Sequence, residues 1–325
     1  LIEGEVTYLN VALDAAPTVA ISGQVLDAAS GLAVPNAHVA VFNNQISFQT
    51  AADAAGQFNL PAVFTGTYSV VAGAWGYKYA AKNNQNLSTS QTYTLELDKG
   101  YRDDFLFDYG WEVNGTSDGG AWERGEPLGV DVGIALAPGT DIGGDVGNLC
   151  YTTGNGSDAV DVDDVENGTM NLVSPPMNLS GFNDPIMLGF LYFTSFTFDQ
   201  QSLDSIRFYV DNGVTEKLMF TLPGANPAWK ALNLHLKDYN SMSDNVRIRI
   251  ECYDNPAFQD LDSYEATFDF FRVAEGNATG TGEPLTGAML TARPNPFRGQ
   301  ILLEYRMLLE GEVANPANPT SGCYF

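Results

Sequence analysis

The sequence predicts an all-β protein made of two antiparallel sandwiches, a small one followed by a larger one of the jelly-roll type. Three observations predict this class. Short runs rich in β-branched and aromatic residues recur along most of the chain, turn residues separate them, and no segment has convincing helical periodicity. With 325 residues, of which 44% are hydrophobic, the chain is long enough for two or three domains with cores of their own.

Residues 1–14 form the first predicted strand, which Ala15-Ala-Pro17 ends. A single strand is not stable alone in water, so it must pair with another sheet. The segment from Thr7 to Asp14 is similar to that from Thr92 to Asp98, the expected last strand of the small sandwich. We therefore interpret residues 1–14 as the terminal strand of a preceding or partner β-domain.

The small sandwich is expected over residues 17–99, where the turns leave room for seven short strands. Glycine-containing turns such as Asp53-Ala-Ala-Gly56 separate these strands, because backbone with positive φ favours glycine. The clearest strands cover residues 19–25, 38–42, 58–60, 66–72 and 92–97.

The larger sandwich is expected over residues 103–274, where about ten strands in some 170 residues suggest a jelly roll. A strand over 103–113 opens it. The strongly apolar run over 187–198 is typical of a fully buried strand, and Asn212-Gly213 predicts a hairpin turn.

The composition argues against two classes of partner. The formal net charge is −25 and the 15 Lys and Arg residues are scattered, so we expect no nucleic acid to bind. No run of 18 apolar residues occurs, so we expect no membrane span. The chain begins with Leu1 and lacks a signal peptide, which indicates a processed protein or a piece of a longer one. High acidity with few cysteines favours a secreted bacterial protein, extracellular or on the cell surface.

An acidic stretch over residues 158–168 is the main candidate for a bound ion. Five carboxylates lie within nine residues before Gly168, and such charges repel one another unless water or a cation neutralises them. Two interpretations stay open, a solvated acidic loop or a sandwich corner stabilised by Ca²⁺, which prefers oxygen ligands. The stretch is not an EF-hand, because Glu166 stands where that loop requires glycine.

The expected calcium ligands come from this stretch and from the closing strand. They are Asp163, Asp164, Glu166, Glu265 and Asp269. Asp269 is the sharpest candidate, because a carboxylate flanked by phenylalanines must be paired if it points inward. Its alternative position is the outward face of an edge strand.

The chain has no recognisable catalytic constellation. His38 and His235 are its two histidines, and neither accompanies a nucleophile motif or a zinc-binding HExxH motif. Acidic residues are plentiful, and nothing selects a pair for glycoside hydrolysis. We therefore expect no enzymatic activity from this chain.

Two tryptophans and two cysteines each allow two interpretations of their position and role. Trp111 and Trp122 either form an exposed platform for a sugar or pack in the core. Cys150 and Cys252 lie in strand-like runs, and they either form a disulfide or remain two buried thiols.

Residues 18–98 resemble the carboxypeptidase regulatory-like domain. The resemblance rests on Ser22-Gly-Gln-Val25, on Val34-Pro-Asn-Ala37, on Asp53-Ala-Ala-Gly56 with Phe58, and on Gly66-Thr-Tyr68. It implies a transthyretin-like (or Ig-like) sandwich with no catalytic role of its own.

The rest of the chain resembles other modules of secreted bacterial proteins. Gly120-Ala-Trp-Glu-Arg-Gly125 and the closing Asp269-Phe-Phe-Arg-Val273 are similar to the MAM-like jelly rolls appended to secreted peptidases. Residues 275–290 are then a linker. In the segment 291–325, Pro294-Asn-Pro-Phe297 resembles the start of a Bacteroidetes-type C-terminal sorting or Ig-like domain, of which only part is present.

Three functions stay open at this point. The first is a non-catalytic structural or adhesive subunit of a bacterial surface assembly or filament, whose copies or neighbouring β-domains join through terminal strands. The second is the C-terminal accessory region of a secreted peptidase. The third is a carbohydrate-binding module with a glycan as its partner.

Overall fold

The computed structural model describes residues 15–131, 135–156, 164–197, 204–223, 226–255, 262–276, 288–294 and 301–307. Within these ranges nearly all regular structure is β-strand, with one short 3-10 helix, η1 (Leu236–Asp238), which confirms the predicted all-β class. The described part of the chain contains no helix that is long and apolar enough to cross a bilayer. The described residues form two compact units, residues 15–74 with 79–99 and residues 75–78 with everything from 100 onward.

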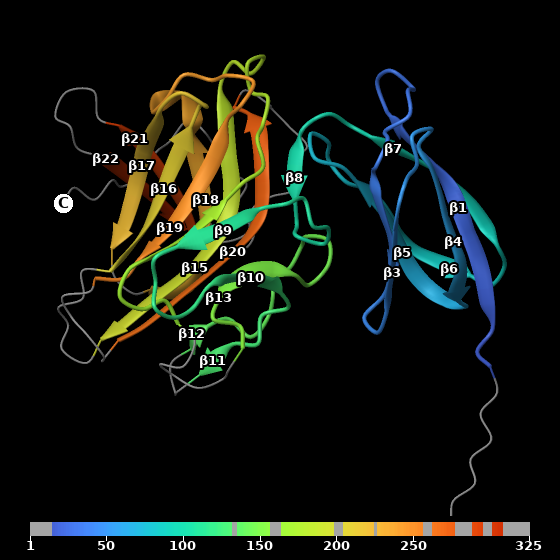
Figure 1. Cartoon of the computed structure of the whole chain (residues 1–325), viewed down its shortest axis with the longest axis horizontal. Coiled ribbons are helices and arrows are strands. Elements are labelled where there is room, and N and C mark those ends of the chain that lie inside the picture. The colour runs from blue at the N-terminus through green and yellow to red at the C-terminus, as the bar shows by residue number, and fades with distance from the viewer. Residues whose placement is uncertain are drawn as a thin grey trace, which may run out of the picture. The chain divides into compact units, whose positions relative to one another are not determined.

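The first unit consists of a three-stranded sheet, in the order β4-β1-β7, and a four-stranded sheet, in the order β3-β2-β5-β6 (Figure 1). Its strands are β1 (Thr18–Asp27), β2 (His38–Phe42), β3 (Ser47–Ala51), β4 (Gln57–Phe64), β5 (Gly66–Gly73), β6 (Ala80–Leu87) and β7 (Gln91–Leu97). The seven strands agree with the number that the turns predict.

The central strand β1 shows why the sequence forms this sheet. It pairs antiparallel with β4 and parallel with β7. Alternate residues face the core, and Ile21 and Val25 are 0% exposed. Gly23 lies between them on the same face, where a Cβ atom would come within 1.9 Å of the Tyr93 carbonyl oxygen. Only glycine therefore allows β7 to approach β1 so closely.

The second unit consists mainly of two larger sheets, and most of their strands are labelled in Figure 1. An eight-stranded sheet has the order β10-β13-β20-β15-β18-β21-β22, with β8 also paired to β20, and a five-stranded sheet has the order β17-β16-β19-β14-β9. Strands β11 and β12 pair separately. The strands are β8 (Tyr101–Asp103), β9 (Glu112–Gly115), β10 (Trp122–Gly125), β11 (Val130–Asp131), β12 (Ala135–Ala137), β13 (Cys150–Thr153), β14 (Thr169–Val173), β15 (Pro185–Thr197), β16 (Ser205–Asp211), β17 (Glu216–Pro223), β18 (Asn226–His235), β19 (Arg247–Tyr253), β20 (Asp262–Glu275), β21 (Ala288–Pro294) and β22 (Ile301–Met307).

Both large sheets contribute side chains to one core. In β16 the alternate residues Ile206, Phe208 and Val210 are 0% exposed, and they pack in the same cluster as Phe193 and Phe268 of the other sheet. Period-two alternation of apolar residues is what a strand needs when one of its faces is buried. The cluster closes the sandwich between the two sheets.

The prediction of a single strand over residues 103–113 is wrong. The structure has β8 ending at Asp103 in the eight-stranded sheet and β9 starting at Glu112 in the five-stranded sheet. Between them Phe105 and Gly110 have φ angles of 54° and 82°, which end extended structure. The Asp103 carboxylate accepts a hydrogen bond from the Phe105 N–H at 2.8 Å and fixes this turn.

The C-terminal strands correct a second expectation. The last segment was expected to pair with another chain. Instead β21 adds in parallel to β18 of its own sheet, with Lys230 opposite Ala288. Most of the linker expected over residues 275–290 lies outside the described residues, between β20, which ends at Glu275, and β21. Strand β22 then pairs antiparallel with β21. The predicted N-terminal strand over residues 1–14 lies outside the described residues.

Candidate metal centre

A β-bulge in β20 positions the first residue of the candidate site. Between the pairs Leu188–Arg272 and Phe190–Asp269, β15 advances by two residues while β20 advances by three. Phe270, inside the bulge, has a φ of 59°, a conformation that phenylalanine rarely adopts. The bulge places Phe268 and Phe271 in the core between the sheets, whereas Phe270 packs against Phe190 in a separate cluster.

The loop over residues 138–149, between β12 and β13, supplies the other two residues. Its Ile142 packs against the separate cluster that contains Phe270, which holds the loop on β20. Asp141 and Asp145 flank two glycines, and Gly144 has a φ of 101°, so the chain turns sharply between the two aspartates. The loop therefore presents two carboxylates from residues that are four apart.

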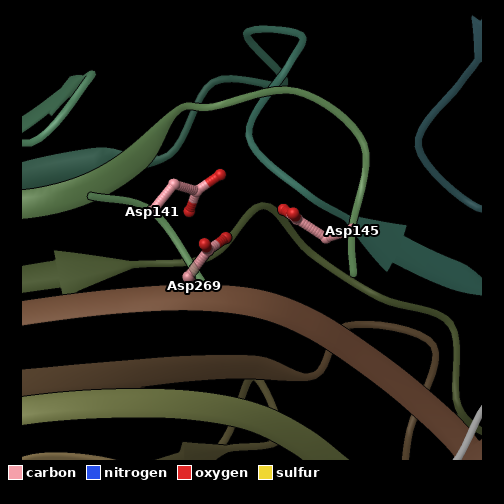
Figure 2. A group of neighbouring side chains, drawn as sticks. All are labelled: Asp141, Asp145 and Asp269. Atoms are coloured by element: carbon pink, nitrogen blue, oxygen red, sulfur yellow. The ribbon is translucent and has the colours of Figure 1, made fainter. Parts of the chain in front are cut away.

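Asp141, Asp145 and Asp269 bring their carboxylates together. One oxygen of each lies within 4.8 Å of the others, and Figure 2 shows the three side chains pointing into a common space, Asp269 from β20 and the two others from the loop. Asp269 is fully buried and the other two are half-buried. Both oxygens of Asp141 and the Oδ2 atoms of Asp145 and Asp269 are buried without a hydrogen-bond partner. Such oxygens are costly unless a proton or a cation compensates them.

The electrostatics of the cluster agree with this geometry. Burial, with the negative charges of Asp141 and Asp104, raises the pKa of Asp145 to about 8. Burial and the contact with Asp141 raise the pKa of Asp269 well above its usual range. Burial is also the main cause that raises the pKa of Asp141. Without a cation, the cluster therefore retains protons at neutral pH.

Asp104 is a fourth buried carboxylate beside the cluster. Its Oδ2 accepts hydrogen bonds from Arg102 at 2.6 Å and from the Val146 N–H at 3.0 Å, and its Oδ1 lies 3.4 Å from Arg272. Asp104 thus anchors the loop one residue after Asp145. Its charge is met by two guanidinium groups, in contrast to the charges of Asp141 and Asp269.

The structure separates most of the ligands that were expected for calcium. Glu265 is buried on β20 and accepts a hydrogen bond from Thr153 Oγ1 at 3.3 Å, and Asp164 accepts one from the Tyr264 N–H at 3.0 Å. Glu166 is half-buried, and its backbone forms an isolated β-bridge with Gly119. Asp163 lies outside the described residues. Within the described residues only Asp269, of this expected set, belongs to a group of three potential ligands. Glu265 and Asp269 are four residues apart on an extended strand, roughly 13 Å, too far to share one ion.

The sequence contained a signal for the two residues that were missed. Asp141-Ile-Gly-Gly-Asp145 pairs two carboxylates across glycines that allow a sharp turn. The acidic stretch over residues 158–168 is denser in carboxylates, yet its described members do not converge on a common point. Charge density alone does not show which carboxylates the fold will bury.

The remaining candidates have clear positions. Trp111 and Trp122 are 7% and 3% exposed, so they pack in the core and form no platform. Cys150 and Cys252 are free and buried, in different sheets, so they form two buried thiols. His235 lies within 3.1 Å of Asp184 at the end of β18. Cys323 lies outside the described residues.

Comparison with solved structures finds all-β chains of low similarity. The K1 cleaved adhesin domain of Lys-gingipain from Porphyromonas gingivalis W83 is 14% identical, with a TM-score of 0.34 over 55% of this chain and 99% of that one. A xylan-binding domain from CBM 22 is 10% identical, with a TM-score of 0.30 over 55% and 96%. BcpA, the major pilin subunit of Bacillus cereus, is 9% identical, with a TM-score of 0.22 over 89% and 64%. At these scores the likenesses carry no argument about what this chain does.

Comparison with curated proteins finds no significant match. A family model does match part of the chain, as its turn motifs predict. Residues 20–98, within the first unit, match the carboxypeptidase regulatory-like domain.

Proposed function

We propose that this chain is a non-catalytic β-sandwich module of a bacterial extracellular protein, and that Ca²⁺ bound by Asp141, Asp145 and Asp269 stabilises its second unit. One observation carries the proposal. Four buried carboxylate oxygens of these residues have no hydrogen-bond partner, and one from each residue lies within 4.8 Å of the others. A cation is the simplest group that satisfies all of them together.

The local charge favours a divalent ion. When all are ionised, Asp104, Asp141, Asp145 and Asp269 carry four negative charges, and Arg102 and Arg272 supply two positive ones beside Asp104. The net charge of these six groups is then −2, which one divalent cation would neutralise. The candidate ligands are all oxygen atoms on a loop and a strand, which suits the flexible coordination of Ca²⁺ better than the strict octahedron of Mg²⁺.

The cation would act on the fold and not on a substrate. Asp141 and Asp145 belong to the loop over residues 138–149, and Asp269 belongs to β20, so a shared ion crosslinks the loop to the sheet. This crosslink adds to the contact of Ile142 and to the hydrogen bond from Val146 to Asp104. A protein in a calcium-containing exterior would thereby gain stability that it lacks without the ion.

Calcium binding and thermal unfolding test the proposal. Calorimetry of the wild-type chain should show one Ca²⁺ per chain, and EDTA should lower the melting temperature by roughly 5–10 °C, the shift for an ion at about a hundred times its dissociation constant. Asp141→Asn and Asp269→Asn should weaken binding at least about tenfold. Asp244→Asn, at an exposed position, is the matched control and should bind normally. Melting curves that are identical with and without EDTA would refute the calcium centre.

We also propose that the chain assembles through residues 1–14, on the sequence argument that this strand needs a partner sheet. A chain that lacks residues 1–14 should keep its β-sheet circular dichroism and its melting transition but lose any polymers seen by electron microscopy. Polymers of unchanged length in that variant would reject the assembly role.

The family match of residues 20–98 favours a second candidate, the accessory region of a secreted peptidase. Mass spectrometry of the protein from its native source separates the two. A gene product with a peptidase domain before residue 1 supports the accessory role. A product whose mass corresponds to this chain supports the structural subunit.

A further inference from the structure

Two buried aspartates at one end of the second unit join three neighbouring strands. Asp204 directly precedes β16 and is 0% exposed, and Asp254 directly follows β19 and is 5% exposed. Asn167 lies just before β14. In the five-stranded sheet β16, β19 and β14 are adjacent, with Ser205 and Thr169 both opposite Tyr253, so these strand ends lie at the same edge.

Hydrogen bonds tie the two carboxylates to all of these strand ends. Asp254 Oδ2 accepts from the Asn167 N–H at 2.5 Å, and the Asp254 N–H donates to the Gly168 carbonyl at 2.9 Å. Asp204 Oδ1 accepts from the Asn255 N–H at 3.1 Å. The two side chains also contact each other directly.

One further contact reaches the opposite sheet. Asp204 Oδ2 accepts a hydrogen bond from Ser195 Oγ at 2.7 Å, and Ser195 belongs to β15 of the eight-stranded sheet. The aspartate pair therefore connects the two sheets at this end of the sandwich. Opening of the pair would break this contact between the sheets and the hydrogen bonds at the strand ends together.

The pair suits a proton better than a metal ion. Three of its four carboxylate oxygens already accept hydrogen bonds from protein donors, and Asp254 Oδ1 is buried with no donor. One oxygen is too few for a calcium site, which needs six to eight. A proton on one of the two carboxyls turns their mutual repulsion into a hydrogen bond. The cluster at Asp141 differs, because four of its oxygens lack donors.

We propose that Asp204 and Asp254 share one proton and form a pH-sensitive clasp, which holds the ends of β14, β16 and β19 to β15 and loosens when the proton leaves. The clasp uses no residue of the calcium centre, so it stands whether or not that centre binds an ion.

The titration of Asp254 supports this role. Burial, together with the charge and the hydrogen bond of Asp204, raises its pKa to about 6, although the N–H groups of Asn167 and Asn255 lower it. A carboxyl whose pKa is raised by folding stabilises the folded form fully below its ordinary pKa near 4. That contribution is lost as the pH rises through 6. The clasp is therefore closed in acid and loosens near neutrality.

The other charged and titratable groups near the pair lie on β16, β19, β20 and the segment before β14. Burial raises the pKa of Cys252 on β19 and of Tyr264 on β20, so both stay neutral. Glu251 is paired with Arg207 and Arg249. The other acidic residues on the neighbouring elements are Asp164 and Glu166, before β14, and Glu265, on β20.

Amide hydrogen exchange of the full chain tests the clasp, in saturating Ca²⁺ so that Asp141, Asp145 and Asp269 keep one state. In the wild type, protection at Asn167 and Asn255 should fall about tenfold between pH 5 and pH 7.5, the change that linkage gives for a carboxyl with a pKa of 6 when closed and 3.8 when open. An unchanged protection factor at both amides would overturn the proposal.

Matched variants separate the shared proton from a general effect of pH. Asp254→Asn is neutral at every pH and can donate from Nδ2 to Asp204, so its protection should stay high at pH 7.5. Asp204→Asn also removes one acceptor, because both oxygens of Asp204 accept hydrogen bonds, so only its pH dependence is compared, and its fall between pH 5 and pH 7.5 should be shallower. Asp244→Asn is the exposed control and should behave as wild type. A tenfold fall that persists in both pair variants would overturn the clasp.

Metal binding gives a further outcome. In an Asp269→Asn background, calorimetry should detect no calcium binding that depends on Asp254. Calcium binding in that background that disappears on Asp254→Asn would show that the pair holds a cation and not a proton, and would overturn the proposal.

Discussion

The indole Nε1 of Trp111 donates a hydrogen bond of 2.9 Å to Oδ2 of Asp103, and both residues are buried. Oδ1 of the same carboxylate accepts from the Phe105 N–H at 2.8 Å. One side chain thus satisfies two buried donors at the point where the chain passes from one sheet to the other. The aspartate takes the role that a backbone carbonyl has within a strand.

Replacement of Asp103 should therefore destabilise the second unit strongly. Asp103→Ala leaves two buried N–H groups without an acceptor, and each costs about 1–3 kcal/mol, so we expect a loss of about 2–6 kcal/mol in the free energy of unfolding. Chemical denaturation measures it. Asp103→Asn keeps one acceptor oxygen, so its free energy of unfolding should lie between those of the wild type and the alanine variant. A loss below about 0.5 kcal/mol for the alanine variant would contradict this account of the turn.

The calcium centre predicts a pH dependence of stability that calcium removes. In EDTA, the raised pKa of Asp145, about 8, together with the raised pKa of Asp269, means that folding favours the protonated carboxyls. Their contribution is present in acid and is lost as the pH rises through 8. The melting temperature in EDTA should therefore fall between pH 6 and pH 9.

Saturating Ca²⁺ should flatten this fall, because the ion replaces the protons. Asp141→Asn is the comparison in EDTA, since it removes one of the interacting charges and should make the fall shallower. Equal slopes with and without calcium would argue against a centre at these three residues.

Gly23 predicts a local packing failure in the first unit. A Cβ atom at this position would lie 1.9 Å from the Tyr93 carbonyl oxygen and 2.8 Å from the ring of Phe58. Because the closest atom is backbone, Gly23→Ala must push β7 away from β1, and we expect a loss of about 3 kcal/mol or more. Gly31→Ala is the control, since its Cβ would meet nothing within 4 Å and only the strain of its φ of 67° remains. Similar stabilities for the two variants would contradict the packing argument.

The two buried cysteines predict slow thiol chemistry. Burial raises the pKa values of Cys150 and Cys252 far above the usual range, and both side chains are 0% exposed. In a Cys323→Ser background, the folded chain should not react with an aromatic disulfide reagent at pH 8 over an hour. In guanidinium chloride it should react with two equivalents. Rapid reaction of the folded chain would show that one sheet opens often.

The fold was largely predictable from the sequence because strands and turns have local signatures. Alternation in Ile206, Phe208 and Val210 and the turn at Asn212-Gly213 each follow from neighbouring residues. The break between β8 and β9 was missed, since it depends on the side chain of Asp103 and on the positive φ of Phe105, which no periodicity reveals.

The candidate site was harder to predict because it depends on contacts between distant segments. Asp269 was recognisable, since a carboxylate among phenylalanines must be compensated if it is buried. Its partners Asp141 and Asp145 come from more than 120 residues earlier, and a bulge in β20 decides which face Asp269 takes. A one-residue shift of that kind reverses every side chain after it and is invisible in a residue pattern.

The pairing of β20 has a consequence for biosynthesis. This strand takes its hydrogen-bond partners from β8, β13 and β15, all of which leave the ribosome long before Glu275 does. The first unit is complete once β7 joins β1, at Leu97. The small sandwich can therefore fold during translation. The larger one keeps unpaired strand edges until β20 has been synthesised, and it is the part of the chain most exposed to aggregation before folding.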